Sequence, residues 1–368
     1  MKNLETLIQE LCPDGVEFVK LGDVLDYEQP TKYIVKCKDY QNEGMPVLTA
    51  GQTFILGYTD ETNGIFEASK ENPVIIFDDF TTSFHWVDFN FKVKSSAMKM
   101  LRVSSEREVS FRFVYYAMKC IKYQTLEHSR QWISKYSQIE IPLPPIEVQT
   151  EIVRILDKFT SLEAELEAEL DCRRRQYEYY RDKLLSFDNV GGQEVECKKI
   201  GEICKIMNGR DYKHLSEGDI PVYGSGGIMT YVNESAYNKP SLLIPRKGSI
   251  GNLFYVETPF WTVDTLYWTK IDECLIVPKF FYYYMTTKDL TKLNMAAGVP
   301  SLTQSMLYKI KIPIPSLEEQ HRIVSILDRF ESLTTSLQAG LPAEIAARRQ
   351  QYEYYRDKLL TFKRKGAA

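Results

Sequence analysis

Several loop-like runs of this sequence are rich in side chains that donate and accept hydrogen bonds. In the first third of the chain the candidates are Gln52, Asp78, Asp79, Thr81, Thr82, Arg130 and Gln131, and further along they are Arg210, Lys213, Ser225, Arg246, Lys247 and Asn252. These residue types match the donors and acceptors of base edges, and the glycines near the later set let backbone approach a phosphate closely. Contact with DNA is therefore a hypothesis for each residue, and ordinary surface placement is the alternative.

Motifs for chemistry on DNA are missing. There is no N/D-P-P-Y/F motif to hold a flipped adenine, and the run Gly248-Ser249-Ile250-Gly251 is too short to indicate a turn that binds S-adenosylmethionine. The sequence has no G-x-x-x-x-G-K-[ST] motif for ATP. The pair Asp78 and Asp79 could suggest a nuclease, but no third carboxylate with an E-x-K element follows. We therefore predict no catalytic residue, and a recognition or structural role for this pair.

Cysteine and histidine give no sign of a metal site. The seven cysteines form no C-x-x-C pair, and the four histidines lie far apart in the sequence. An odd number of cysteines without such pairs argues against a disulfide framework and against a zinc ribbon. We expect buried free thiols and no metal.

Charge and hydropathy narrow the class of protein further. The net charge is −4, and no segment is a basic block, so any contact with DNA must come from locally placed charges. No run of about 18 apolar residues indicates a membrane span, and the first residues do not resemble a signal peptide. We expect a cytoplasmic protein.

A long-range duplication organises the chain. The run Ile141-Pro142-Leu143-Pro144, followed by Glu147, Gln149 and a series of matching residues to Leu162, recurs 171 positions later, from Ile312 to Leu333. The block Gln-Tyr-Glu-Tyr-Tyr-Arg-Asp-Lys-Leu-Leu occurs unchanged at 176–185 and 351–360. Weaker echoes link Pro46-Val47 with Pro221-Val222. The predicted organisation is two variable domains, 1–140 and 191–311, each followed by a near-identical helical spacer, 141–190 and 312–368.

The spacers are predicted to be long helices. No glycine or proline occurs between 146 and 187, and apolar residues recur three or four positions apart, as in a coiled coil. Such a helix is about 60 Å long. In the second spacer Gly340 and Pro342 predict a kink. The two rods are expected to pack on each other in antiparallel fashion, because either one alone would expose an apolar stripe.

The variable domains are predicted to be mixed α/β. The runs Val74–Phe77 and Ser241–Ile244 indicate buried strands, and glycine-rich stretches such as 224–227 and 248–251 indicate turns. The predicted fold class is thus α+β: two mixed α/β domains joined by a pair of long antiparallel coiled-coil helices with pseudo-two-fold symmetry.

Two divergent domains that alternate with near-identical helices opened by I-P-x-P-x-x-E-x-Q resemble the specificity subunit of type I restriction-modification enzymes, over essentially the whole chain. The opening Leu11-Cys12-Pro13-Asp14-Gly15-Val16-Glu17 is also typical of that family. The resemblance implies two target-recognition domains that bind double-stranded DNA at a bipartite, non-palindromic site. It also implies docking of two methyltransferase subunits and association with restriction subunits. S-adenosylmethionine, ATP and Mg²⁺ would then belong to those partners, with no cofactor in this chain.

The duplicated tyrosine-rich block suggests where partners bind. Stacking on single-stranded nucleic acid is one interpretation, but Tyr177, Tyr180 and Leu184 fall on the apolar seam of the predicted helix. Side chains off that seam that are identical in both copies would suit two equivalent partner-binding faces. These side chains are Tyr179, Arg181, Tyr354 and Arg356.

A short tandem repeat lies inside the first spacer. Glu-Ala-Glu-Leu occurs at 163–166 and again at 167–170. Helix-favouring filler is one interpretation. The other is a spacing module, since four residues lengthen a helix by about 6 Å, which corresponds to about one to two base pairs. Two rival functions remain open at this point: a self-contained DNA methyltransferase, which the missing motifs oppose, and a coiled-coil adaptor that binds only protein.

Overall fold

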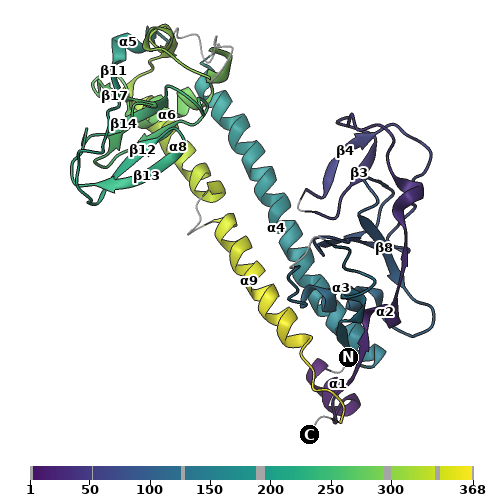
Figure 1. The fold of residues 1–368 in the computed structure, drawn as a ribbon. Coiled ribbons are helices and arrows are strands. Elements are labelled where there is room, and N and C mark those ends of the chain that lie inside the picture. Colours follow the sequence, from purple (N-terminus) through teal and green to yellow (C-terminus); the bar gives the residue numbers. More distant parts are fainter. Residues whose placement is uncertain are drawn as a thin grey trace. The chain divides into compact units, whose positions relative to one another are not determined.

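The computed structural model describes residues 3–51, 53–125, 129–187, 195–293, 300–335 and 340–366 (Figure 1). Within them the chain forms two compact units. The first unit comprises residues 1–165 and 346–368, and the second comprises residues 166–345. Each unit therefore combines one variable domain with parts of both helical spacers.

The first unit contains the elements that surround the first variable domain. In chain order they are α1 (Leu4–Leu11), β1 (Glu17–Lys20), α2 (Leu21–Val24), β2 (Leu25–Glu28), η1 (Pro30–Tyr33), β3 (Met45–Leu48), β4 (Ile55–Thr59), β5 (Val74–Asp78), β6 (Phe84–Val87), β7 (Lys92–Val93), β8 (Met98–Val103), α3 (Phe111–Lys119), η2 (Tyr136–Gln138) and β9 (Glu140–Leu143). The helix α4 (Ile146–Ser186) starts in this unit and continues into the second one.

The second unit repeats this plan. Its elements are β10 (Cys197–Lys199), α5 (Ile200–Ile203), β11 (Cys204–Asn208), β12 (Ile220–Gly224), β13 (Gly227–Val232), β14 (Ser241–Pro245), β15 (Phe254–Val256), β16 (Trp261–Thr262), β17 (Leu266–Ile271), α6 (Pro278–Thr286), η3 (Leu290–Leu293), α7 (Gln304–Leu307), β18 (Lys311–Pro313) and α8 (Leu317–Thr335). The last helix, α9 (Leu341–Leu359), starts here and ends in the first unit.

The sheets of the two variable domains have the same topology. The strand orders β2-β8-β5-β6, β4-β3-β7 and β1-β9 in the first unit correspond to β11-β17-β14-β15, β13-β12-β16 and β10-β18 in the second. The short pairs β3 with β7 and β12 with β16 are parallel in both. Even an irregularity of register is shared, at Val47/Leu48 and at Val222/Tyr223. The variable domains, whose sequences differ, are thus two versions of one fold.

The central strands formed where apolar runs predicted them. Val74–Phe77 is completely buried in β5, and Ser241–Ile244 is completely buried in β14. Each strand lies between two neighbours in its four-stranded sheet, so both of its edges are hydrogen-bonded. Because successive side chains point to opposite faces and all of them are buried, both faces are covered and no polar alternation is needed. These strands and the mixture of helix and sheet confirm the sequence-based expectation.

The helix α4 confirms the predicted long helix almost residue for residue. In the first unit it packs against α9, with Phe159 stacked on Tyr355 at 5.6 Å and Glu163 paired with Arg349 at 2.5 Å. In the second unit Tyr180 of α4 stacks on Phe330 of α8 at 5.7 Å. From Phe159 to Glu163 the residue number rises along α4, while the number of the contacted residue on α9 falls from Tyr355 to Arg349. The helices of the first unit therefore run antiparallel.

The second spacer is divided into two helices at the predicted kink. The helix α8 ends at Thr335, and α9 begins at Leu341 with Pro342 in its first turn, where proline is tolerated. Gly340 adopts a φ of 78°, a left-handed conformation that favours glycine. A Cβ atom at this position would lie 2.8 Å from the carbonyl oxygen of Leu333. Among the described helices none is long and apolar enough to cross a membrane.

Candidate nucleic-acid interface

The turn that follows β5 holds four of the predicted contact residues. Asp78 accepts hydrogen bonds from the backbone N–H groups of Phe80 and Thr81 at 2.9 and 2.8 Å, which is the pattern of an Asx turn. Thr81 is exposed, and Thr82 has a φ of 60°. A β-branched residue is rare in that left-handed region, so this turn is held in a strained conformation by its surroundings.

Asp79, by contrast, is buried. Its Oδ2 atom lies 3.4 Å from Lys99 Nζ and 3.3 Å from Arg130 Nη1, and its Oδ1 accepts a hydrogen bond from Trp132 N at 2.9 Å. The side chains of Asp79 and Lys99 are each only 1% exposed, whereas that of Arg130 is 50% exposed. The buried carboxylate is thus satisfied on both oxygens, and it cannot itself face a base.

Gln131 is also buried and supports the chain beside Arg130. Its side-chain amide donates to the carbonyl and hydroxyl oxygens of Ser129 at 2.7 and 3.0 Å and accepts from the Tyr123 hydroxyl at 2.8 Å. Of the predicted set in this domain, Arg130, Thr81 and the turn of Asp78 lie at the surface, and Asp79 and Gln131 lie beneath it. Gln52 lies outside the described residues.

In the second unit the predicted residues gather around three neighbouring loops. The Asn252 amide donates to the carbonyl oxygen of Ser225 at 3.3 Å, and a Cβ at Gly248 would lie 3.2 Å from the Ser225 hydroxyl. The loop after β14 and the turn between β12 and β13 therefore touch. Arg210 is tied to the same end, because its backbone N–H donates to Thr262 O at 2.8 Å and its carbonyl accepts from Trp261 Nε1 at 3.1 Å.

The basic side chains of this loop cluster face solvent. Arg210, Lys213 and Lys247 are exposed, and Arg246 is half-buried with its guanidinium 5.9 Å from the ring centre of Tyr267. Among the described residues, no carboxylate lies within ion-pair distance of these four side chains. Unpaired cations at one end of a domain can neutralise phosphates. Gly209 passes so close to Val263 O that no side chain fits there.

The shared topology places Asp79 and Arg246 at equivalent positions. Asp79 N donates to Ala97 O at 2.8 Å and Asp79 O accepts from Gln131 N at 2.8 Å, just as Arg246 N donates to Thr265 O at 2.8 Å and Arg246 O accepts from Leu302 N at 2.9 Å. The strand registers likewise make Lys99 equivalent to Tyr267. One backbone framework therefore carries a buried acid and lysine in one domain and an arginine beside a tyrosine in the other.

The duplicated glutamines attach each variable domain to its helix. Gln149 Oε1 accepts a hydrogen bond from Ser110 N, the N-cap of α3, at 2.9 Å, and Gln149 Nε2 donates to Pro144 O at 2.7 Å. Gln320 accepts from Val277 N, the N-cap of α6, at 2.7 Å and donates to Pro315 O at 2.9 Å. Both glutamines are fully buried, which accounts for the glutamine of the I-P-x-P-x-x-E-x-Q repeat.

The duplicated aspartates, Asp157 and Asp328, attach each variable domain to its helix at a second point. Asp157 accepts from the Tyr116 hydroxyl at 2.5 Å and from Arg112 Nε at 2.9 Å. Asp328 accepts from the Tyr283 hydroxyl at 2.5 Å and pairs with Lys279 at 2.9 Å. Burial, reinforced by these hydrogen bonds, raises the pKa of both tyrosines well above the ordinary value. Each tyrosine therefore stays protonated and donates to its carboxylate.

These attachments were only partly visible in the sequence. The glutamines and aspartates stood out as repeats, but their partners Tyr116 and Tyr283 lie in the divergent domains, where no shared spacing marks them. Lys99 was missed as well, because a lysine in a sequence is normally taken as exposed. Its place in a strand of otherwise apolar residues, Met98 to Leu101, was the signal that could have identified it.

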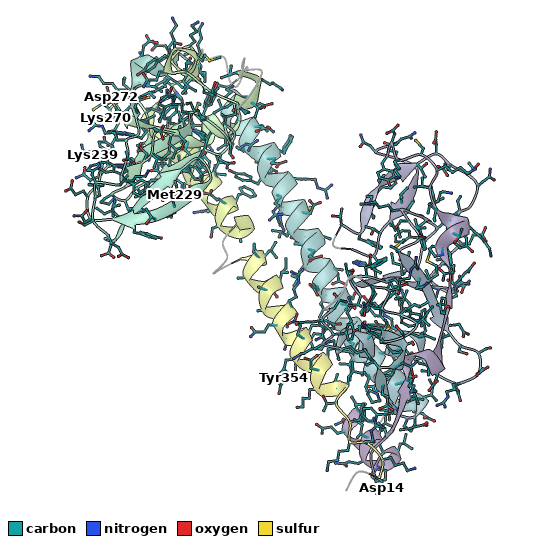
Figure 2. The ribbon with its side chains drawn as sticks, in the orientation of Figure 1. Asp14, Met229, Lys239, Lys270, Asp272 and Tyr354 are labelled. Carbon is teal, nitrogen blue, oxygen red and sulfur yellow. The ribbon has the colours of Figure 1, made fainter. Side chains whose placement is uncertain are left out.

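In each copy of the tyrosine-rich block, the predicted partner-binding tyrosine is exposed and the predicted partner-binding arginine is largely covered. Tyr179 and Tyr354 are 61% and 62% exposed, and Figure 2 shows Tyr354 on an open side of α9. The side chains of Arg181 and Arg356 are only 19% and 15% exposed, and each pairs with the aspartate that follows it. Both tyrosines are thus exposed, as expected for positions off the apolar seam, and the arginines are largely occupied within the chain.

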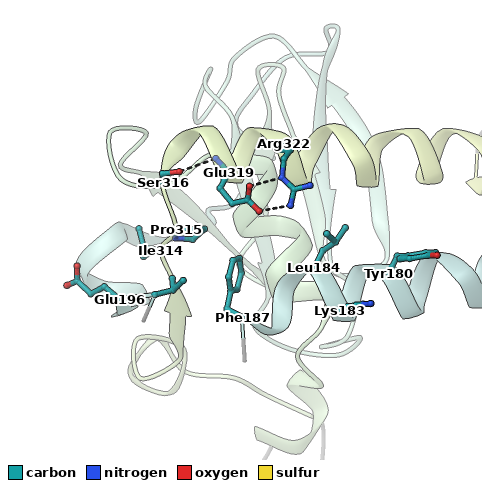
Figure 3. Close-up of a pocket in the computed structure, with 11 residues that line it drawn as sticks. Tyr180, Lys183, Leu184, Phe187, Glu196, Ile314, Pro315, Ser316, Glu319 and Arg322 are labelled. Atoms are coloured by element: carbon teal, nitrogen blue, oxygen red, sulfur yellow. Dashed lines mark hydrogen bonds and ion pairs between the residues drawn. The ribbon is translucent and has the colours of Figure 1, made fainter. Parts of the chain in front are cut away.

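Each unit has an apolar cavity built from this duplicated block. The cavity of the second unit, about 760 Å³, is lined by Tyr180, Leu184 and Phe187 of the first spacer and by Glu319 and Arg322 of α8 (Figure 3). The cavity of the first unit, about 570 Å³, is lined by the equivalent Tyr355, Leu359 and Phe362 together with Leu4, Ile8 and Phe159. The chain therefore presents two related apolar cavities.

Comparison with known proteins gives a consistent result. A family model described as the type I restriction modification DNA specificity domain matches residues 13–171 and 192–347. The type I restriction enzyme EcoR124I/EcoR124II specificity subunit of Escherichia coli is 42% identical over 402 aligned positions, which cover 98% of this chain and 97% of that protein.

Solved structures have a similar fold. The S subunit of the type I restriction-modification system from M. genitalium matches with a TM-score of 0.59 and 21% identity, over 94% of this chain and 96% of that one. A chain from a study of complex assembly and conformational transition in the type I R-M system matches with a TM-score of 0.56 and 17% identity, over 95% and 98%.

Proposed function

This chain belongs to the family of type I restriction-modification DNA specificity subunits, and from that premise we propose that it reads a bipartite, non-palindromic DNA site and docks two methyltransferase subunits. The chain is the non-catalytic component that supplies sequence specificity to such a complex. The chemistry belongs to the partners, which methylate adenine and, with restriction subunits present, translocate and cleave DNA.

One observation carries the bipartite site: the same loop framework bears different side chains in the two variable domains. The turn after β5 carries Asp78 and Thr81 above a buried Asp79, while the equivalent loop after β14 carries Arg246, Lys247 and Asn252. Equivalent loops with unlike hydrogen-bonding groups would read unlike base pairs. We assign the first half-site to residues 1–140 and the second to residues 191–311.

The helices are proposed to set the distance between the half-sites. The two spacers, 141–190 and 312–368, would form an antiparallel coiled coil that relates the domains by a pseudo-two-fold axis. The glutamine and aspartate attachments support this role, because they tie each domain to its own helix at two points. A stiff helix then converts its length into a fixed number of base pairs.

The two apolar cavities support docking of two copies of one methyltransferase subunit. Tyr180, Leu184 and Phe187 in the lining of one cavity correspond to Tyr355, Leu359 and Phe362 in the lining of the other. The tyrosine-rich block beside each cavity also includes an exposed tyrosine. Aromatic side chains of this kind are enriched in interface hot spots. Two equivalent faces on one chain suit two identical partners.

Mapping methylated adenines tests the proposal directly. The chain should be expressed with its methyltransferase subunit in cells that lack other adenine methylation, and the genome should be sequenced for modified bases. We expect one motif made of two unlike half-sites with a constant gap, and none when the gene for this chain is deleted. A single contiguous motif, or a motif that persists after the deletion, contradicts the proposal.

A further inference from the structure

We propose that Arg130 reads a guanine in the first half-site and that Asp79 is the positioning residue that aims its guanidinium. This inference rests on the proposed function and gives it a residue and a base. It treats Asp79 and Gln131, which are buried, as support for one exposed reader.

The charge of Arg130 is not cancelled by Asp79. The carboxylate already pairs with Lys99 at 3.4 Å, and both of these side chains are 1% exposed. A buried acid with a buried base forms a neutral pair, and Arg130 at 3.3 Å adds a further positive charge at the surface. The group as a whole therefore presents one net cation to solvent, as an approach to DNA requires.

The geometry around Arg130 is fixed from several sides. The backbone N–H of Asp79 donates a hydrogen bond to Ala97 O, and the backbone carbonyl of Asp79 accepts one from Gln131 N, each at 2.8 Å. The Gln131 side chain holds Ser129 on the other side of Arg130, and Trp132 N donates to Asp79 at 2.9 Å. The guanidinium itself pairs with Asp79 at 3.3 Å and lies 5.9 Å from the ring centre of Phe80. A side chain positioned by its backbone and by these contacts loses less conformational entropy on binding, which favours selective recognition.

The guanidinium chemistry points to guanine rather than to phosphate. Arginine has five N–H donors in a planar fork, and only Nη1 is directed to Asp79 in this structure. The rest of the fork lies on a side chain that is 50% exposed and can donate two parallel hydrogen bonds to O6 and N7 of guanine. A phosphate can be approached by a guanidinium from many directions, whereas O6 and N7 of guanine must be met in the plane of the base, so a buried carboxylate that orients the arginine favours the base contact.

The second domain provides a natural contrast on the same framework. At the position of Asp79 it has Arg246, and at the position of Lys99 it has Tyr267, whose ring centre lies 5.9 Å from that guanidinium. The neutral buried pair and its arginine are therefore features of the first domain alone. Substitution of Arg246 gives a matched control that should act on the other half-site.

The test is to map methylated adenines with the complete complex carrying Arg130→Ala, Arg130→Lys or Arg246→Ala. Arg130→Ala should reduce the preference at a single G·C pair by roughly 10-fold to 100-fold. The other positions, the gap and the second half-site should stay unchanged. Arg130→Lys should relax the same position, because lysine keeps the charge but lacks the fork. Arg246→Ala should leave the first half-site unchanged.

The positioning role of Asp79 needs a variant that keeps the interior neutral. Asp79→Asn alone strands Lys99 without its counter-ion, so the double variant Asp79→Asn with Lys99→Met is the informative one. It should relax the same G·C pair as Arg130→Ala while the second half-site stays intact, and the intact half-site reports that the chain is folded. An unchanged first half-site in this variant overturns the role of Asp79.

Failure of this inference can be told apart from failure of the proposed function. If the wild-type complex marks a bipartite motif but Arg130→Ala weakens methylation equally at all sites, Arg130 is a phosphate contact and the inference is wrong. The same conclusion follows if Arg130→Ala leaves the motif unchanged. If the wild-type complex marks no bipartite motif, the proposed function itself fails.

Discussion

Gln149 and Gln320 illustrate how much one buried side chain can do in this fold. Each completes hydrogen bonds to a helix N-cap and to a proline carbonyl. We expect Gln149→Ala or Gln320→Ala to lower the free energy of unfolding of the affected unit by about 1–3 kcal/mol, since buried backbone groups lose their partners. Hydrogen exchange of α3 and α6 measures this unit by unit. The exposed Gln351→Ala on α9 serves as control and should change stability by less than about 0.5 kcal/mol.

The cysteines give a second prediction at this scale. Burial raises the pKa of Cys120 to about 11 and that of Cys204 to about 12, and it also raises the pKa of the buried Cys12. A raised pKa leaves less thiolate at pH 8, and the thiolate is the form that reacts. The expectation of buried thiols is wrong for four cysteines, which are exposed: Cys37, Cys172, Cys197 and Cys274. Alkylation of the folded chain followed by mass spectrometry should label these four first, and rapid labelling of Cys204 would contradict the structure.

The exposure and burial of single residues were only partly predictable from the sequence. Gln149 belongs to the repeated motif that the sequence made visible, and exposure of Tyr179 followed from the helical period, because repetition and period can both be read directly from the sequence. Burial of Asp79 and Gln131 did not follow, since it depends on Lys99 and Tyr123 reaching them through the tertiary structure. A polar side chain in a loop-like run looks the same in sequence whether it faces DNA or the interior.

Under the proposed function, α4 is the element that sets the spacing between the half-sites. The repeat 163–170 contains the boundary between the two compact units, which falls between Glu165 and Leu166. Deletion of Glu167–Leu170 should therefore shorten the gap of the recognised site by about one to two base pairs, because four residues span about 6 Å of helix. Both half-sites should remain the same.

A substitution of equal length controls for local sequence effects. The variant Glu167→Ala with Glu169→Ala keeps the number of residues and the helix propensity, so its gap should equal that of the wild type. Mapping of methylated adenines reports both variants. An unchanged gap after the deletion would show that this stretch does not set the spacing.

The attachment of α3 to α4 is a further property of elements. Tyr116→Phe removes a hydrogen bond to the carboxylate of Asp157, and such bonds to charged groups contribute about 1.5–3 kcal/mol. Amide exchange in α3 should speed up accordingly, and Tyr283→Phe should do the same for α6. Tyr354→Phe, which changes an exposed hydroxyl, should leave both helices unaffected.

Elements were predicted well where the signal was long or uniform. An absence of glycine and proline over some 40 residues predicted α4, and apolar runs predicted β5 and β14. The common topology of the two variable domains stayed hidden. Short strands joined by divergent loops leave only echoes such as Pro46-Val47 and Pro221-Val222, which fall at the same register irregularity in the two domains.

At the scale of the whole molecule, the two domains should be interchangeable. They share strand order, register and both attachments to a helix. A chain in which residues 195–311 are replaced by the equivalent residues of the first domain should fold. Its complex should recognise the same half-site twice, in inverted orientation under the proposed pseudo-two-fold arrangement. Retention of two unlike half-sites by this chimera would contradict the assignment of one half-site to each domain.

The residues that attach the variable domains lie in the duplicated stretches and not in the divergent ones: Gln149, Gln320, Asp157 and Asp328. This placement affects how the gene could exchange one variable domain for another. The duplicated stretches 141–185 and 312–360 lie on either side of the second variable domain, so recombination within the gene segments that encode them would exchange that complete domain. The incoming domain needs only a helix N-cap and a tyrosine at the correct places to be held as its predecessor was. Such a gene can change its DNA target in one genetic event, with no compensating mutation elsewhere.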